Sequence, residues 1–83
     1  LDLGIMAAVL SSYYDRALPA RAVFWGEVDL SGQIRPVAGQ DSRIRQARQL
    51  GFRPIYCPGE ESEKSQDLVP LDNVFTLLAK LFS

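Results

Sequence analysis

The chain has 83 residues with a formal net charge of -1, and 47% of its residues are hydrophobic and 23% charged. This length allows one domain with a modest core, and the near-neutral charge argues against a strongly basic nucleic-acid binder. No apolar run approaches the ~18 residues of a membrane span, so we expect a soluble domain without membrane contact.

Two features of the sequence indicate its context. The chain does not start with Met, and Leu1 already lies in a helix-like run, so we interpret it as a fragment of a longer protein without a recognisable signal peptide. Cys57 is the only cysteine and there is no histidine, which excludes an internal disulfide and a Cys/His zinc site. We therefore expect a reducing, cytoplasmic location and a buried structural thiol at Cys57.

The first half of the chain predicts a helix followed by a β-hairpin. Apolar residues recur at helical spacing over residues 2–17, and the N-terminal half of this run is apolar nearly all round, so we expect packing on most of its sides. Residues 22–28, "AVFWGEV", have strand formers on both faces, which predicts an interior strand. "DLSG" is typical of a type I turn, and residues 33–37 resume an extended run in which Pro36 lies near an edge or an end.

A second helix is predicted to start with Asp41 or Ser42 as N-cap and to end at Gly51, which supplies a left-handed residue. Arg43 falls within its apolar stripe and is predicted to be structural, with its head on a carboxylate or a carbonyl, whereas Arg45 and Arg48 point away. Residues 54–57, "PIYC", form the next strand, which implies a right-handed parallel crossover.

The remainder of the chain predicts a solvated loop over residues 59–67, a short extended piece at 68–70, and a last helix capped by Asp72. The apolar stripe of that helix consists of Val74, Leu77, Leu78 and Leu81. The fold class is therefore an α/β sandwich in one domain, residues 1–83, with the element order α-β-β-α-β-(short β)-α.

The charges are unevenly distributed along the chain. Residues 33–54 contain five arginines against one aspartate, a net +4, whereas residues 59–72 contain five acidic residues against one lysine, a net -4. Arg45, Arg48 and Arg53 lie close together off the predicted apolar stripe, so they are candidates for contacts to DNA phosphates. A solvated basic face, balanced by the acidic loop, is the alternative interpretation.

The search for catalytic motifs is mostly negative. Without histidine there is no Ser-His-Asp or Cys-His arrangement, no Walker-type phosphate loop is present, and no metal-ligand cluster has usable spacing. A Ser-Lys dyad is the one nucleophilic arrangement still conceivable. Neither Lys64 nor Lys80 lies where burial is predicted, and a lysine base needs burial to lower its pKa.

Four segments carry a resemblance to a known family. "DLGIMAAVLSSYYDRALP", "FWGEVDLSGQIRPV", "SRIRQARQLGF" and "PIYCP" occur in the order and spacing of the C-terminal domain of the bacterial RadA (Sms) DNA repair family. That domain is similar to the proteolytic domain of Lon, with an α/β fold also found in a small-subunit ribosomal protein. The resemblance implies a Lon-protease-like fold whose N-terminal part is missing here.

Comparison with Lon implies that the domain is a pseudo-protease. In active Lon a motif like GEITLRGxVLPVGGxKEK follows the same hairpin, and its first Lys is the base of the Ser-Lys dyad. Ungapped alignment of "GEVDLSGQIRPVAGQDSR" puts Asp41 in place of that Lys and Arg43 in place of the second. An ionised carboxylate repels the developing alkoxide, so no catalytic residue is predicted. The Lon serine would align just before Leu1.

The resemblance further implies a longer protein that is a ring-forming, hexameric ATPase of the RecA class with a zinc finger, acting in recombination and branch migration. ATP, Mg and Zn would bind other parts of that protein, and this domain would be an assembly scaffold and a DNA-contacting surface. Two alternatives stay open. One is the Lon-like domain of a magnesium-chelatase-related ATPase such as ComM, whose pattern "GELxLxGxLRPVRG" resembles residues 26–39. The other is a Lon-type serine peptidase, which Asp41 disfavours.

Overall fold

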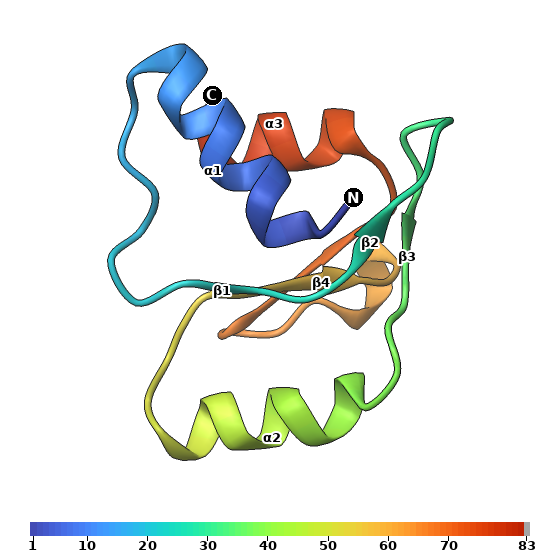
Figure 1. Cartoon of the computed structure of the whole chain (residues 1–83). Helices are drawn as coiled ribbons and strands as arrows, with labels where there is room; N and C mark the ends of the chain where they lie inside the picture. Colours follow the sequence, from blue (N-terminus) through green and yellow to red (C-terminus); the bar gives the residue numbers. More distant parts are fainter. Residues whose placement is uncertain (83) are drawn as a thin grey trace.

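The computed structural model describes residues 1–82 as a compact mixed α/β domain (Figure 1). Its elements are α1 (Leu3–Tyr14), β1 (Val23–Phe24), β2 (Glu27–Val28), β3 (Ile34–Arg35), α2 (Gln40–Gln49), β4 (Ile55–Pro58), the 3-10 turn η1 (Glu61–Glu63), β5 (Leu68–Leu71) and α3 (Val74–Phe82). Helices α1 and α3 cover one face of the parallel sheet and α2 covers the other. No helix within residues 1–82 is long and apolar enough to cross a membrane.

The parallel sheet has the strand order β1-β4-β5, with Val23 opposite Ile55 and Ile55 opposite Leu68. The parallel pairing of β1 with β4 confirms the predicted crossover through α2. The central strand β4 is buried, and its alternation directs Tyr56 toward α1 and α3 and Cys57 toward α2. The main core cluster lies on the Tyr56 side and consists of Leu3, Val28, Ile34, Tyr56, Leu71 and Leu77.

Within residues 1–82 the prediction of one interior strand over residues 22–28 is wrong, because β1 lies at the edge of the described sheet and the run is divided in two. Gly26 causes the division: its φ of 150° is a conformation that other residues rarely adopt. Beyond Gly26 the chain leaves the parallel sheet, and β2 pairs with β3 in an antiparallel hairpin. The predicted hairpin itself is confirmed, and Pro36 follows directly after β3.

The hairpin turn is held by one carboxylate. Asp29 accepts hydrogen bonds from the Ser31 N–H (2.9 Å), the Ser31 hydroxyl (2.7 Å) and the Gln33 N–H (3.0 Å). The Arg35 Nε donates to the same carboxylate at 3.0 Å. The hydrogen bond from Ser31, followed by that from Arg35, lowers the pKa of Asp29 to about 2. Leu30 is fully exposed at the tip of this ordered turn.

Helix α1 packs on one side only. Asp2 is its N-cap and accepts a hydrogen bond from the Ile5 N–H at 3.1 Å, and the helix ends at Tyr14 with Asp15 in a left-handed conformation. Leu3 and Ala7 are fully buried, whereas Ile5 and Val9 are 55% and 56% exposed. The prediction that the apolar half of this helix is packed on most sides is therefore wrong within residues 1–82, because the sheet covers only the face of Leu3 and Ala7.

The two ends of α2 differ in how well they were predicted. The helix begins two or three residues earlier than expected: Gly39, with a φ of 75°, is the N-cap, and Asp41 lies within the first turn. The assignment of Asp41 or Ser42 as N-cap is therefore wrong, although the Asp41 charge still suits the positive end of the helix dipole. At the other end Gly51 is left-handed as predicted, and the Phe52 N–H donates to the Ala47 carbonyl at 2.9 Å.

The C-terminal part contains more regular structure than predicted. The acidic loop includes η1, and the short extended piece is a four-residue strand, β5, paired with β4. Asn73, not Asp72, caps α3, because the Asn73 Oδ1 accepts the Thr76 N–H at 3.0 Å. Asp72 instead accepts the Thr76 hydroxyl at 2.6 Å, so the two acceptors bind the backbone N–H and the hydroxyl of one residue.

Candidate functional site

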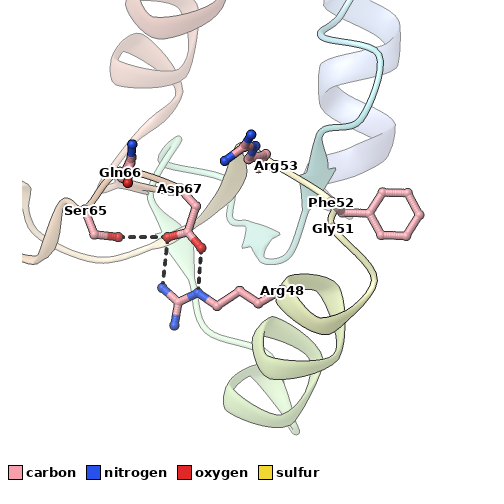
Figure 2. Close-up of a pocket in the computed structure, with 7 residues that line it drawn as sticks. All are labelled: Arg48, Gly51, Phe52, Arg53, Ser65, Gln66 and Asp67. Carbon is pink, nitrogen blue, oxygen red and sulfur yellow. Dashed lines mark hydrogen bonds and ion pairs between the residues drawn. The ribbon is translucent and has the colours of Figure 1, made fainter.

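The three candidate DNA-contacting arginines lie on or just after α2 and are all exposed. Arg48 and Arg53 border one cavity of about 510 Å³, shown in Figure 2. Its other lining residues are Gly51, Phe52, Ser65, Gln66 and Asp67. Arg45 borders a different hollow, beside Asp41 and Ser42 at the start of the helix. The structure therefore brings Arg48 and Arg53 together and places Arg45 on a neighbouring surface.

Arg48 forms a two-point ion pair with Asp67 (Figure 2). Its Nε lies 2.8 Å from the Asp67 Oδ2 and a second guanidinium nitrogen lies 3.2 Å from Oδ1, which also accepts the Ser65 hydroxyl at 3.0 Å. The hydrogen bond from Arg48 is the main cause that lowers the pKa of the Asp67 carboxyl. The charge of Arg48 is thus balanced, and its side chain ties α2 to the residue before β5.

Arg45 and Arg53 differ from Arg48 because neither side chain makes a hydrogen bond or an ion pair with residues 1–82. Their charges are therefore uncompensated and face solvent. Sequence reasoning treated the three arginines alike, since Asp67 lies in a loop whose direction no local pattern reveals. The ion pair joins residues 19 positions apart, beyond the reach of helical spacing rules.

Arg43 has an aromatic partner. Its guanidinium carbon lies 5.1 Å from the centre of the Trp25 ring, a cation–π distance, and no carboxylate or carbonyl within residues 1–82 accepts a hydrogen bond from it. The expectation of a carboxylate or carbonyl partner is therefore wrong. The sequence does contain a signal for the observed contact, because Trp25 follows directly after β1 and lines the same hollow as Arg43 of α2.

Asp41, which takes the place of the Lon base in the alignment, is exposed in the first turn of α2. The side chain of Lys80 lies 3.4 Å from Glu61, and Lys64 is exposed beside η1. No serine hydroxyl within residues 1–82 is hydrogen-bonded to a lysine amine. The residues that the structure describes therefore contain no assembled Ser-Lys dyad.

Cys57 is buried, and desolvation by burial is the first cause that raises its pKa to about 11, with the Glu63 charge as the next cause. A thiol with so high a pKa is protonated at neutral pH, which confirms the structural interpretation of Cys57. No group of three or more His, Cys, Asp or Glu side chains within residues 1–82 is placed to hold a metal ion. The residues present therefore do not fit a zinc site.

Comparison with curated proteins gives consistent matches to one kind of protein. DNA repair protein RadA of Rickettsia bellii is 41% identical over 74% of this chain, and that of Synechocystis is 34% identical over 95%. Homologues named DNA repair protein RadA thus cover most of this chain. RadA of Streptococcus pyogenes is 32% identical over the whole chain. The chain spans only 14 to 19% of the length of these RadA relatives, and no protein-family model matches it.

Proposed function

We propose that this chain is a Lon-like, peptidase-inactive domain of a RadA-type DNA repair ATPase, with two roles: contacting DNA and holding copies of the protein together. The single observation that carries the proposal is the similarity to RadA along most of the chain. Asp41 in place of a lysine base supports the non-catalytic part. ATP, Mg and Zn would bind elsewhere in the longer protein, in the cytoplasm, where its branch-migration activity would reside.

The proposed DNA contact rests on the uncompensated charges of α2 and the segment after it. Arg45 and Arg53 are exposed without a carboxylate partner, so each can neutralise a phosphate without first breaking an ion pair. Arg48 borders the same cavity as Arg53, but binding a phosphate there would require releasing Asp67. Contacts of this kind are independent of base sequence, because they reach only the backbone.

We expect Arg45→Gln combined with Arg53→Gln to weaken DNA binding by the full-length protein. Each phosphate contact adds ~0.7 to 0.9 to the slope of log affinity against log salt, so the double variant should lose about 1.4 to 1.8 from that slope. Fluorescence anisotropy with a labelled oligonucleotide at several salt concentrations measures both quantities. Arg48→Gln is the matched control and should leave the slope nearly unchanged. An unaltered slope in the double variant would refute the DNA contact.

The absence of peptidase activity is a separate expectation. The protein should not cleave an unfolded substrate such as casein, because a carboxylate at position 41 opposes the charge that develops on an attacking serine. Asp41→Lys in the chain of residues 1–83 tests whether a lysine at this position alone creates activity. We expect no cleavage from either protein, since no serine is hydrogen-bonded to a lysine amine within residues 1–82. Cleavage that disappears on substituting a serine would contradict this expectation.

The proposed ring assembly draws on the outer face of α1. Ile5 and Val9 are one turn apart and more than half exposed, and such apolar stripes mark interaction sites. Ile5→Ser with Val9→Ser should shift the full-length protein to smaller species in light scattering with ATP and Mg²⁺. Leu30→Ser, at the fully exposed hairpin tip, is the control and should leave the mass unchanged. An unchanged mass in the double variant would place assembly elsewhere.

A further inference from the structure

Asp67 binds Arg48 with a geometry that a phosphate would also satisfy. The Arg48 Nε lies 2.8 Å from one Asp67 oxygen, and a second guanidinium nitrogen lies 3.2 Å from the other. Two parallel N–H donors facing two oxygens form the fork by which arginine binds carboxylates and phosphates alike. A phosphodiester has two unbridged oxygens and the same single negative charge. Asp67 therefore occupies the position that a DNA phosphate would take on Arg48.

Neighbouring groups hold the Asp67 carboxylate in this place. The Ser65 hydroxyl donates to the Asp67 Oδ1 at 3.0 Å, and the hydrogen bond from Arg48 is the first cause that lowers the pKa of Asp67. Asp67 is thus ionised at neutral pH, and its charge opposes any other anion that approaches Arg48. The hydrogen bond from Ser65 also engages a hydroxyl that is then not available to a phosphate oxygen.

Arg53 shares the cavity of about 510 Å³ with this ion pair. In the view of Figure 2 the Asp67 carboxylate points toward Arg48, and Arg53 lies on its other side. Among residues 1–82, Asp67 is the only acidic residue that lines the cavity. The side chains of Arg48 and Asp67 are 44% and 28% exposed, and ion pairs open to solvent are weak. Asp67 is nevertheless attached beside Arg48, so it competes at a high effective concentration.

We propose that Asp67 competes with a backbone phosphate of DNA for Arg48, in a phosphate site that Arg53 completes. This inference rests on the proposed DNA contact and names the residue that limits its strength. Asp67 weakens the contact in two ways, because it neutralises Arg48 and places a negative charge beside a phosphate bound to Arg53. A weak contact that is independent of base sequence suits a protein that moves along DNA, since each phosphate must be released again.

Asp67→Asn should strengthen DNA binding by the full-length protein. The amide keeps the shape of the side chain and still accepts a hydrogen bond from Ser65, but it has no charge to neutralise Arg48. One added phosphate contact steepens the slope of log affinity against log salt by ~0.7 to 0.9, which is about five- to eightfold tighter binding at about 0.1 M salt. Anisotropy titrations with the labelled oligonucleotide measure both quantities.

Asp72→Asn is the control for net charge. Asp72 belongs to the same acidic segment but lines a different hollow, with Glu60 and Glu61, so its removal changes the net charge equally without affecting Arg48. The slope should change by less than about 0.3 in this variant. Equal gains from Asp67→Asn and Asp72→Asn would mean that overall charge sets the affinity, which overturns the proposal.

Two further variants separate the charge of Asp67 from its structural role. Asp67→Glu keeps the charge and should leave the slope unchanged, so an equal gain with Glu and with Asn would indicate a disturbed loop and overturn the proposal. Adding Arg48→Gln to Asp67→Asn should abolish the gain, and a gain that persists contradicts the competition for Arg48. Circular dichroism verifies the fold, and Asp67→Ser takes the place of Asp67→Asn if that variant does not fold.

The salt slopes also distinguish this inference from the DNA contact on which it rests. If Asp67→Asn leaves the slope unchanged while the Arg45 and Arg53 double variant lowers it, the competition is refuted and the DNA contact stands. An unaltered slope in that double variant refutes the DNA contact and this inference with it.

Discussion

Replacing Leu77 with alanine should lower the free energy of unfolding by about 2 to 5 kcal/mol, a large part of the stability of so small a domain. Leu77 is fully buried on the inner side of α3 and belongs to the core cluster formed with Leu3, Tyr56 and Leu71. Truncation leaves a cavity between the helix and the sheet that neither can close. Urea unfolding followed by circular dichroism measures the loss.

Phe75→Ala is the matched control on the same helix. Phe75 is 79% exposed, so its truncation removes little buried surface and should change the free energy of unfolding by less than about 0.5 kcal/mol. Equal losses in the two variants would mean that α3 does not face the sheet through Leu77. The comparison therefore tests the orientation of α3, and not only its presence.

Gly26→Ala should destabilise the chain by about 2 to 4 kcal/mol, since two penalties combine. The φ of 150° disfavours any side chain, and an added Cβ would lie 3.1 Å from the Ile34 Cγ2 and 3.2 Å from the Pro58 Cγ. Gly26 lies where the chain passes from the parallel sheet to the hairpin, so relaxing the contact displaces one of them. Urea unfolding again measures the effect.

Gly39→Ala separates the conformational penalty from the packing penalty. Its φ of 75° is also unfavourable, but no atom lies within 4 Å of an added Cβ. The expected loss is about 1 to 2 kcal/mol, from backbone strain alone. If Gly39→Ala proves as costly as Gly26→Ala, the crowding between the hairpin and β4 contributes nothing.

Local patterns predicted those parts of the fold that local forces determine. The hairpin, the C-terminal end of α2 at Gly51 and the parallel crossover follow from turn residues and apolar spacing, and all three are present. The edge position of β1 was missed because a strand-forming composition does not reveal how many neighbours a strand has. The caps of α2 and α3 were misplaced by one to three residues, because Gly39 and Asn73 take the role that nearby aspartates also suit.

The sequence predicted which charged residues the candidate site contains, but not which of them contact one another. The sequence identified a basic segment and an acidic segment, and within residues 1–82 one ion pair joins them, Arg48 with Asp67. That contact depends on the parallel alignment of β4 and β5, which no spacing rule contains. The Arg43 contact with Trp25 likewise requires α2 to lie across β1. Long-range pairs of this kind decide which arginines remain free for a ligand.

The irregular segment between α1 and β1 makes hydrogen bonds to the C-terminal ends of two helices that lie on opposite faces of the sheet. Arg16 donates to the Phe82 carbonyl at the end of α3, which is 66 positions away along the chain. Arg21 donates to the Leu50 and Gly51 carbonyls at the end of α2, which are 29 and 30 positions away. Surface loops usually tolerate changes of length. Here the length of the segment between the two arginines sets the distance between their hydrogen-bond acceptors. An insertion or deletion within residues 17–20 would therefore remove the hydrogen bonds to one helix end and leave those to the other.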